Sequence, residues 1–286
     1  MSNIPIIQHS AEILSNREIG PGLYWIDLLS PEITSHAKPG HFVHLITSNL
    51  SKNRTYPAYL SHTPLLRRPF SVAERDPETG VIGLIYRVVG GGTEVLAMRP
   101  TGEYVDLIGP LGRPLKQVEK GKSVIMVAGG VGVAPFLSLV QETIRTKQAT
   151  NDKITVLFGA ANAGLLSGEE KFRDLGVNVK LATDDGSMGY HGLVTDLLIK
   201  EIGGSSQPFS FIYSCGPTSM MRLCQKIARE VGIPGQVSLE GIMPCGVGVC
   251  MACVVPCINP EDQSKQQFYE RVCDKGPVFD INEVVF

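Results

Sequence analysis

Hydrophobic and polar positions change their spacing about 120 residues into the chain. Before that point, β-branched and aromatic residues occur in short runs that partly alternate with polar ones, which is typical of strands. Turn sequences rich in glycine and proline separate the runs, and short strands at this spacing favour a small antiparallel barrel. The predicted strands cover residues 22–28, 41–46 and 81–89, and the predicted turns cover 37–40, 76–80 and 90–92.

Beyond residue 121 the pattern is one of strands alternating with helices. Strands are predicted at residues 123–128, 154–158 and 179–183, and helices at 135–147 and 169–175. Such alternation indicates a parallel sheet. The predicted fold class is therefore an N-terminal antiparallel all-β barrel, then an α/β domain with a parallel sheet, then a small C-terminal subdomain around a cysteine-rich loop.

The spacing of cysteines near the C-terminus is the most specific chemical signal. Cys245, Cys250 and Cys253 have the C-x4-C-x2-C spacing of plant-type ferredoxin loops, in which a fourth cysteine completes the ligands of a [2Fe–2S] cluster. The small residues between them let the backbone curl around a cluster. A structural zinc site is the alternative, but it usually has two close cysteine pairs, and only one is present here.

The fourth ligand has two candidates. We predict Cys273, because a second iron is better reached from a separate strand than from a chain that has just left the loop. Cys257 then remains a neighbour or a spare ligand. Cys215 and Cys224 lie outside the predicted cluster.

A glycine turn follows the predicted strand at 123–128 and opens a helix. Gly129, Gly130, Gly132 and Pro135 belong to it. Exposed N–H groups at a helix start favour a phosphate, so we predict that the turn binds the pyrophosphate of a dinucleotide. The third glycine of the dinucleotide-binding fingerprint is missing, and a plain tight turn is the alternative interpretation.

A third candidate site begins with two arginines, Arg67 and Arg68, at the entry of a probable barrel strand. Arginine suits the planar, bidentate recognition of phosphate. The alternative is a solvated strand end at which Ser71 caps a turn. Together with two segments downstream, the arginines suggest one elongated ligand laid across the barrel; those segments are Ile85, Tyr86 and Arg87, and then Gly92 and Thr93.

Composition and charge limit the possible partners. The chain has 286 residues, which favours about two domains, and a net charge of −2, which gives no electrostatic reason to expect nucleic acid. Seven cysteines and no signal-peptide pattern favour a reducing compartment, so we expect a cytoplasmic protein. Two uncharged stretches reach spanning length, but glycines and prolines interrupt them, and we expect no membrane span.

The motifs, in this order, resemble those of the ferredoxin–NADP reductase superfamily. They are R-R-P-F-S, I-Y-R-V-V-G-G-G-T, G-P-L-G, G-G-V-G-V-A-P and S-C-G-P. Two further motifs, S-L-E-G-I-M-P-C-G-V-G-V-C-M-A-C and V-C-D-K-G-P-V-F, narrow the resemblance to the electron-transfer subunits of class 1B dihydroorotate dehydrogenases. The resemblance extends from about Asn16 to Phe286.

This resemblance implies three parts and their cofactors. They are an FAD-binding barrel at residues 1–118, an NAD-binding domain at 119–235 and a [2Fe–2S] subdomain at 236–286. The Ser71 hydroxyl would lie near the reactive edge of the flavin, and Cys215 would face the nicotinamide, so both are predicted catalytic residues. The residues implied to bind FAD are Arg68, Pro69, Phe70, Ser71, Ile85, Tyr86, Arg87, Gly92 and Thr93, while Gly129, Gly130, Gly132 and Pro135 are expected to face the nicotinamide dinucleotide.

Chemistry and resemblance agree on a relay. A nicotinamide exchanges two electrons as a hydride, a cluster exchanges one, and a flavin connects the two. The predicted function is to carry electrons from dihydroorotate oxidation on a partner subunit, through [2Fe–2S] and FAD, to NAD+ in pyrimidine biosynthesis. The alternatives are the same relay in a hydrogenase or a sulfide- or ferredoxin-linked enzyme, and a zinc-stapled binding module.

Two expectations concern specificity. Asp184 and Asp185 replace the basic residues of NADP-selective relatives, and an acidic residue beside a ribose repels a 2′-phosphate, so we expect NAD(H). The alternative is a plain turn before Gly186. The loop at 247–255 is almost wholly apolar, so we expect an interface at Met251 with a flavin-containing dihydroorotate-oxidising subunit, in a heterotetramer of two plus two. Alternatively, the loop packs inward.

Overall fold

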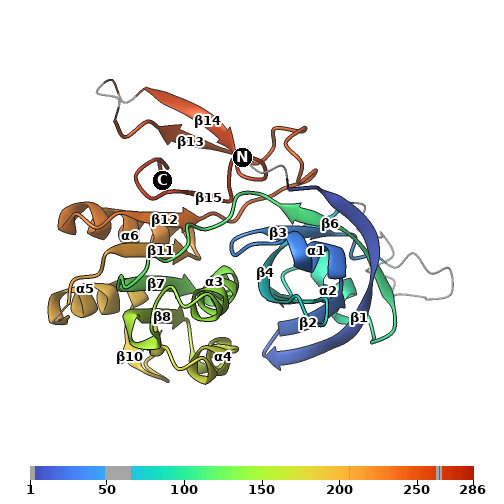
Figure 1. The fold of residues 1–286 in the computed structure, drawn as a ribbon, viewed down its shortest axis with the longest axis horizontal. Coiled ribbons are helices and arrows are strands. Elements are labelled where there is room, and N and C mark those ends of the chain that lie inside the picture. The colour runs from blue at the N-terminus through green and yellow to red at the C-terminus, as the bar shows by residue number, and fades with distance from the viewer. Residues whose placement is uncertain (1–3, 49–65, 206, 262–263, 265) are drawn as a thin grey trace.

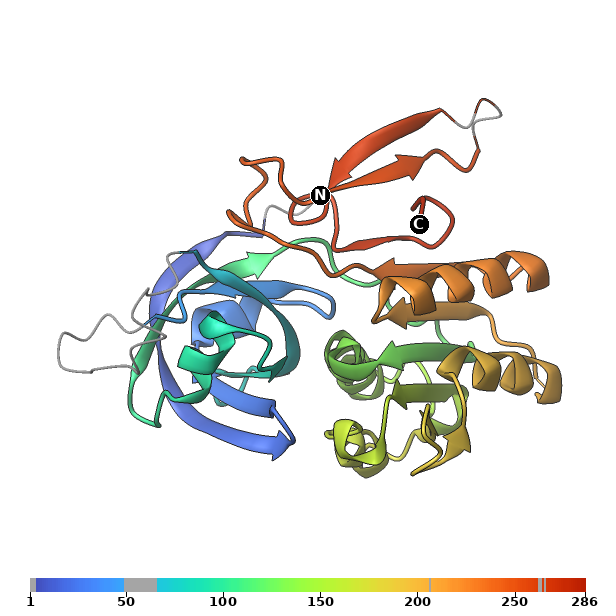
Figure 2. The same ribbon diagram turned by 180° about the vertical axis from the view of Figure 1, so that it is seen from behind.

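The computed structural model describes residues 4–48, 66–205, 207–261, 264 and 266–286. Figure 1 shows a barrel beside a helix-covered sheet, with a two-stranded hairpin lying above the sheet. The view from behind shows the same arrangement, with the hairpin projecting from the body of the molecule (Figure 2). No helix in this described part of the chain combines the length and the apolar character that crossing a membrane requires.

The N-terminal part is a closed antiparallel barrel with the strand order β1-β2-β5-β4-β3-β6, which confirms the predicted barrel. Its core is a cluster of aliphatic and aromatic side chains from alternate positions along each strand, which point inward. Its strands are β1 (Ile7–Gly20), β2 (Leu23–Leu29), β3 (Phe42–Leu45), β4 (Arg68–Asp76), β5 (Val81–Arg87) and β6 (Tyr104–Leu111), and its first helix is α1 (Pro31–His36).

The predicted turn at 90–92 is instead the start of a second helix, α2 (Gly91–Ala97). The Thr93 hydroxyl organises this start, because it accepts a hydrogen bond from the Val89 amide and donates one to the Gly90 carbonyl, at 2.9 and 3.0 Å. Leu96 is buried against the barrel core. The prediction failed because three consecutive glycines resemble a turn, whereas packing of the following apolar residues decides for a helix.

The middle part is a seven-stranded sheet with the order β10-β9-β8-β7-β11-β12-β15. All of its pairs are parallel except that of β12 with β15, as predicted for the α/β part. Its strands are β7 (Val124–Gly129), β8 (Ile154–Ala160), β9 (Asn178–Thr183), β10 (Tyr190–His191), β11 (Phe211–Cys215), β12 (Gly235–Ser238) and β15 (Val278–Asp280).

Helices cover both faces of this sheet. They are needed there because successive apolar side chains of β7 point to opposite faces. Met126 packs on the side of α3 and α4, whereas Ile125 and Val127 pack on the side of α5 and α6. The α-helices are α3 (Ala134–Arg145), α4 (Glu169–Asp174), α5 (Val194–Gly204) and α6 (Thr218–Val231), and the 3-10 turns are η2 (Gly130–Val133), η3 (Asn151–Lys153) and η4 (Ala163–Leu165).

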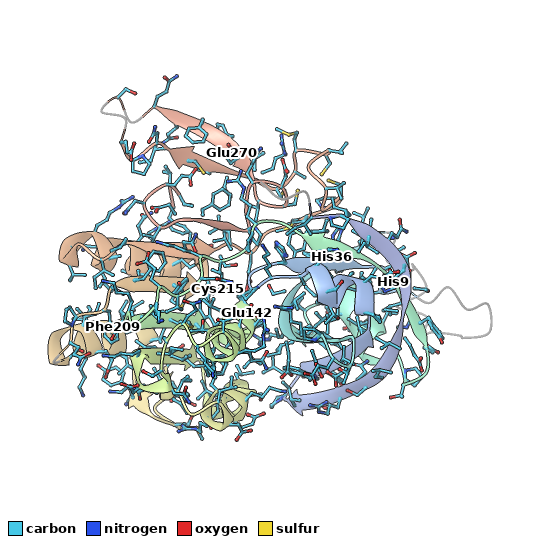
Figure 3. The ribbon with its side chains drawn as sticks, in the orientation of Figure 1. His9, His36, Glu142, Phe209, Cys215 and Glu270 are labelled. Atoms are coloured by element: carbon cyan, nitrogen blue, oxygen red, sulfur yellow. The ribbon has the colours of Figure 1, made fainter. Side chains whose placement is uncertain are left out.

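Partly buried ion pairs join the barrel to the sheet. Arg75 on β4 contacts Glu142 on α3 at 2.7 Å, and both side chains are nearly buried. Glu74 is paired with Lys171 of α4 at 2.8 Å in the same junction. Figure 3 labels Glu142 where the two parts meet. These ion pairs therefore fix the position of the barrel relative to the sheet.

The C-terminal residues belong partly to the sheet and partly to the hairpin of β13 (Val254–Ile258) and β14 (Gln267–Arg271). Strand β15 returns to pair with β12 at the edge of the sheet. The predicted boundary at 235–236 therefore falls inside β12, and the domain limits stay predictions. Residues 239–253, which include the cysteine loop, contain no helix or strand.

Candidate functional site

A cavity of about 340 Å³ opens on the barrel wall; we call it the barrel cavity. Tyr86 stacks on Tyr24 with ring centroids 5.4 Å apart, and its hydroxyl donates to Asn16 at 2.9 Å. These contacts fix one wall of the cavity. Nearly all of the predicted flavin-binding residues lie on its lining: Arg68, Pro69, Phe70, Ser71, Ile85, Tyr86, Arg87 and Thr93.

The two neighbouring arginines have different surroundings. Arg67 forms an ion pair with Asp106 on β6 and donates to the His44 carbonyl at 3.2 Å, so it fastens barrel strands together. Arg68 lines the barrel cavity and donates to the Leu66 carbonyl at 2.7 Å. Gly92 is absent from the lining but lies against Arg68, since a Cβ there would come within 3.1 Å of the guanidinium Nε.

A second cavity, of about 500 Å³, lies at the carboxyl ends of β7, β8 and β11; we call it the sheet cavity. The chain leaves β7 toward β8 on one side and returns to β11 on the other, so the cavity is at the point where the strand order switches. Ligands of open α/β sheets bind at such points. Gly129, Gly130 and Asp184 of the predicted site line it, as do Pro217 and Met220.

Two glycines of the turn are required by geometry. Gly130 has a φ of 55° and open space around it, so the left-handed backbone itself favours glycine there. A Cβ on Gly132 would lie 2.3 Å from the Cys215 carbonyl oxygen, so Gly132 permits the β7 and β11 segments to touch. Pro135 is buried in the first turn of α3, behind η2, and does not line the sheet cavity.

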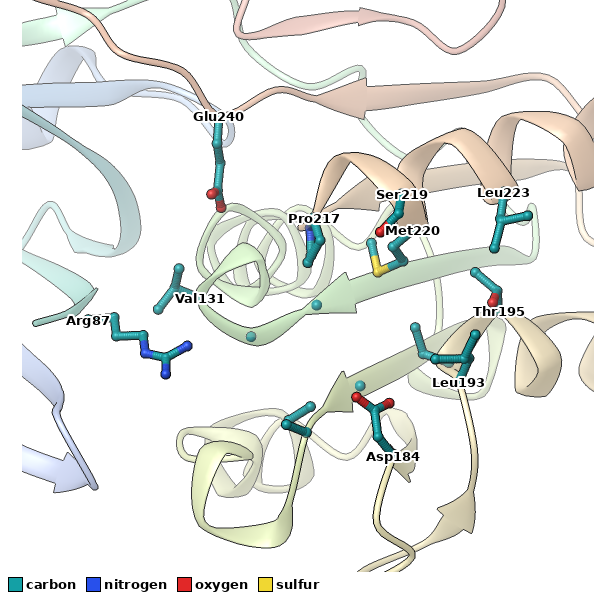
Figure 4. Close-up of a pocket in the computed structure, with 16 residues that line it drawn as sticks. Arg87, Val131, Asp184, Leu193, Thr195, Pro217, Ser219, Met220, Leu223 and Glu240 are labelled. Atoms are coloured by element: carbon teal, nitrogen blue, oxygen red, sulfur yellow. The ribbon is translucent and has the colours of Figure 1, made fainter. Parts of the chain in front are cut away.

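The two predicted aspartates differ as the two arginines do: one lines a cavity, and the other bonds within the protein. Asp184 lines the sheet cavity, and Figure 4 shows its carboxylate directed into it. Asp185 accepts hydrogen bonds from the amide and hydroxyl of Ser187, at 2.9 and 2.6 Å, which lower the pKa of its carboxyl. The turn interpretation therefore describes Asp185, and Asp184 is the one placed to meet a ligand.

The two cavities adjoin, because three residues line both of them: Arg87, Val131 and Glu240. Figure 4 shows Arg87 and Glu240 facing the same space from two sides. Protein around the Glu240 carboxyl raises its pKa, although the side chain is accessible from the cavities. Glu240 was not predicted from the sequence. Its position just beyond β12, at the same sheet edge as the glycine turn, is the signal that could have found it.

The two predicted catalytic residues differ in exposure. Ser71 is half-buried on β4 and lines the barrel cavity. Cys215 is buried at the end of β11 and is absent from the lining of both cavities (Figure 3). Burial raises the pKa of its thiol, and the nearby Glu240 charge adds to this, so the thiol is neutral. The structure brings Cys215 close to the site through its backbone, which Gly132 contacts.

The four cysteines predicted to hold a cluster are arranged as two pairs. The Cys250 amide donates to the Cys245 sulfur at 3.5 Å, and the Cys273 amide donates to the Cys253 sulfur at 3.4 Å. The Gly248 amide, donating to Cys273 at 3.2 Å, connects the pairs. Within the described residues no three His, Cys, Asp or Glu side chains surround a single ion position. Two pairs suit two irons better than one zinc ion.

The thiols differ in how readily they ionise. Burial opposes ionisation of Cys245, but backbone amides, that of Cys250 foremost, outweigh it and lower the pKa of this thiol to about 6. Burial raises the pKa of Cys273 to about 12, and the adjacent Cys253 thiol adds to this. Crowded sulfurs resist carrying several negative charges together. A bound cation removes this resistance, so the donor set fits a metal cluster.

The remaining cysteines belong to the hydrophobic core. Cys257 is fully buried on β13, where it pairs with Phe268 and bridges to Val284. Burial raises its pKa to about 11. Cys224 is fully buried in α6, and burial raises its pKa to about 12. The choice between Cys273 and Cys257 as the fourth ligand stays a prediction, and the sulfur contacts of Cys273 favour it.

Two family models match the chain. One is described as the iron–sulfur cluster binding domain of dihydroorotate dehydrogenase B and matches residues 240–285. The other is described as an oxidoreductase NAD-binding domain and matches residues 126–226. The first covers the cysteine loop and hairpin, and the second covers the sheet cavity.

Curated relatives match almost the whole length. The dihydroorotate dehydrogenase B (NAD(+)) electron transfer subunit of Desulforamulus reducens is 35% identical over 276 residues, which are 96% of this chain and 97% of that protein. The subunit of the same name from Bacillus cereus strain B4264 is 36% identical over 275 residues, 96% of each chain.

Solved structures share the fold. An NADH-dependent reduced ferredoxin-NADP oxidoreductase aligns with a TM-score of 0.78 and 30% identity over 96% of this chain and 89% of that one. The ferredoxin-NADP+ reductase of Plasmodium falciparum aligns with a TM-score of 0.57 and 14% identity, covering 77% and 89%, which supports the fold alone. The predicted fold class is confirmed.

Proposed function

We propose a function from one premise: the chain belongs to the family of dihydroorotate dehydrogenase B (NAD(+)) electron transfer subunits, with which it aligns over nearly its whole length. It is an NAD-linked oxidoreductase subunit that carries electrons between dihydroorotate oxidation on a catalytic partner and NAD+. Its cofactors are FAD and a [2Fe–2S] cluster, and NAD is its substrate.

One observation supports this proposal: the three predicted sites adjoin one another. The sheet cavity and the barrel cavity share Arg87, Val131 and Glu240. Met243 lines the barrel cavity and stands two residues before Cys245, the first cysteine of the loop. A chain whose nicotinamide, flavin and cluster sites adjoin in this order is built as a relay.

The barrel cavity fits an FAD. The Arg68 guanidinium would bind its phosphates, while the apolar wall of Phe70 and Tyr86 would pack on its rings. A bound flavin exchanges a hydride with a nicotinamide and single electrons with a cluster. The Ser71 hydroxyl, half-buried on this wall, would orient the flavin by a hydrogen bond.

The sheet cavity fits an NAD. The glycine turn at Gly130 leaves room for a pyrophosphate beside backbone amides, and Asp184 would accept hydrogen bonds from a ribose while repelling a 2′-phosphate. Glu240 and Arg87, between the cavities, would position the nicotinamide against the flavin. Cys215 would act as a positioning residue through its backbone, because its buried, neutral thiol lies outside the lining.

The cysteine loop fits a [2Fe–2S] cluster with Cys245 and Cys250 on one iron and Cys253 and Cys273 on the other. The pairing of sulfurs and amides supports this assignment. The loop's amides would donate to the sulfurs and so stabilise their negative charge.

The experiment is anaerobic purification of the untagged chain, followed by iron analysis and a visible spectrum. We expect about two irons per chain, as a [2Fe–2S] cluster requires, together with one flavin. NADH should bleach the flavin in a stopped-flow instrument far faster than NADPH. A colourless protein containing zinc, or equal rates with both nucleotides, would contradict the proposal.

The catalytic partner would dock on an exposed apolar surface around the cysteine loop. We call this the loop surface; its residues are Ile242, Val247, Val249, Met251 and Tyr269, of which Ile242 is 84% and Val249 78% exposed. Five exposed apolar side chains gathered in one short segment and its hairpin are typical of an interface. A closed assembly of two such chains with two catalytic subunits is the simplest stoichiometry.

A charge on the loop surface tests this interface. Val249→Glu and Met251→Glu should release the co-expressed catalytic subunit during size-exclusion chromatography, because burying an unpaired charge is costly. Met251 also contacts Arg271, with Sδ 3.5 Å from Nη1, so the Val249 variant is the cleaner one. The control is Ile199→Glu, an exposed apolar position on α5. Retention of the partner by Val249→Glu at wild-type stoichiometry would place the interface elsewhere.

A further inference from the structure

Strand β3 directs its side chains to two different places. Val43 and Leu45 belong to the barrel core, whereas Phe42 packs with the core that includes the C-terminal cysteines. His44 lies on the same face as Phe42, with the two rings edge to face and their centroids 6.5 Å apart. Since Phe42 also lines the barrel cavity, His44 stands on the face that joins this cavity to the cysteine loop.

The His44 ring contacts the cysteine loop directly. A Cβ on Gly246 would come within 2.5 Å of the His44 Nδ1, so the glycine is there to admit the imidazole. The backbone of Met243 and that of Cys245 also lie beside the ring, but neither makes a hydrogen bond of ordinary geometry with it. The imidazole therefore touches the loop at the residue that follows its first cysteine.

His44 is fully buried, and neither of its ring nitrogens has a hydrogen-bond partner among the residues that the structure describes. An unpaired buried polar atom costs free energy, and an acceptor held by the cysteine loop would remove that cost. An imidazole always has at least one ring N–H to donate.

We propose that the His44 N–H donates a hydrogen bond to a sulfur of the cluster that Cys245 anchors, and that this bond raises the reduction potential of the cluster. The inference rests on the proposed function, because it needs the cluster in the loop. Hydrogen bonds to the sulfurs stabilise the extra electron of the reduced form, which is how such clusters are tuned. His44 is then a positioning residue that sets how readily electrons pass between flavin and cluster.

The test is pulsed EPR on the reduced cluster of protein labelled with ¹⁵N-histidine. One histidine of the six in the chain should show a ¹⁵N coupling to the cluster spin. The coupling should vanish in His44→Phe, which keeps a buried ring but removes both nitrogens. His41→Phe is the matched control, because His41 is also buried on this side of the barrel but its Nδ1 already accepts the Lys38 amide at 3.0 Å.

A redox titration gives the second readout. In His44→Phe the ratio of reduced to oxidised cluster at a fixed potential should fall about tenfold, a midpoint shift of about 59 mV for one electron. If His44→Phe loads no iron, the labelled wild type and His41→Phe still decide the matter. A cluster without ¹⁵N coupling in wild type, or a coupling and midpoint unchanged in His44→Phe, would overturn the inference. Wild-type protein without any [2Fe–2S] signal would instead overturn the proposed function.

Discussion

The two cavities and the cysteine loop are built in opposite ways. The cavities are lined by the ends of strands that neighbouring strands hold in place: near the end of β7, Ala128 is paired with Phe158 of β8 on one side and with Cys215 of β11 on the other. The loop at 239–253 contains no helix or strand, and its internal order comes from amides that donate to sulfur. The cavities are therefore formed by the fold itself, whereas the loop depends on what its thiols bind.

This difference predicts that a substitution in one region leaves the other region functional. Metal binding to such a loop contributes free energy to the folding of the loop, because the ligands come together only when the loop is folded. Loss of the cluster should leave the barrel and the sheet cavity intact. Loss of a cavity contact should leave the cluster in place.

The largest effect is expected from removing one sulfur. Cys250→Ser should abolish the [2Fe–2S] absorption and EPR signal while NADH still reduces the flavin at the wild-type rate. Cys257→Ser, a substitution in the core of the hairpin, should retain the iron. Iron analysis and stopped-flow reduction measure both. Loss of flavin reduction in Cys250→Ser would show that the regions are not separable.

Removing the metal should expose a reactive thiol. Without the cluster, Cys245 has a pKa of about 6, because backbone amides outweigh burial, so its thiolate predominates above pH 6. At pH 7 the thiolate is therefore the main form of Cys245, whereas an ordinary thiol is mostly protonated, so iodoacetamide should label Cys245 before Cys273. Labelling should slow as the pH falls from 7 to 5. Mass spectrometry should find Cys245 labelled in the apo protein and protected in the cluster-loaded protein. Equal labelling of Cys245 in the two proteins would contradict the prediction.

The barrel cavity is tested by its neighbouring arginines. Arg68→Ala should weaken FAD binding about 10- to 100-fold, since a charge-assisted hydrogen bond contributes about 1.5–3 kcal/mol. Arg67→Ala should lose about 1 kcal/mol of stability through its ion pair with Asp106, and keep its FAD affinity. Flavin titration and thermal melts separate the two. An equal loss of flavin in both variants would mean that Arg68 stabilises the barrel and does not bind FAD directly.

The smallest effect concerns nucleotide choice. Asp184→Asn should raise the efficiency of NADPH relative to NADH by about tenfold, because a negative charge beside a 2′-phosphate is removed. Asp185→Asn is the control, since Asp185 serves the turn with Ser187. If the control changed the preference and Asp184→Asn did not, the assignment of the two aspartates would be reversed.

The sequence predicted the features that neighbouring residues determine, and it missed those that depend on contacts between distant segments. Short strands, the alternation of helices and strands, and the cysteine spacing are local, and they predicted the fold class and the family. Helix α2 was missed because packing of Leu96 overrides a glycine-rich start. Glu240 and His44 were missed because each acquires its role only when a distant segment folds against it: the glycine turn for Glu240 and Gly246 for His44.

The central claim is that one chain contains an unbroken route from nicotinamide to cluster. It is tested most directly by titrating the isolated, anaerobically purified chain with NADH while recording EPR and absorbance. We predict that the signal of the reduced [2Fe–2S] cluster grows as the flavin bleaches, without the partner subunit. A flavin that NADH bleaches fully beside a cluster that only dithionite reduces would contradict the claim.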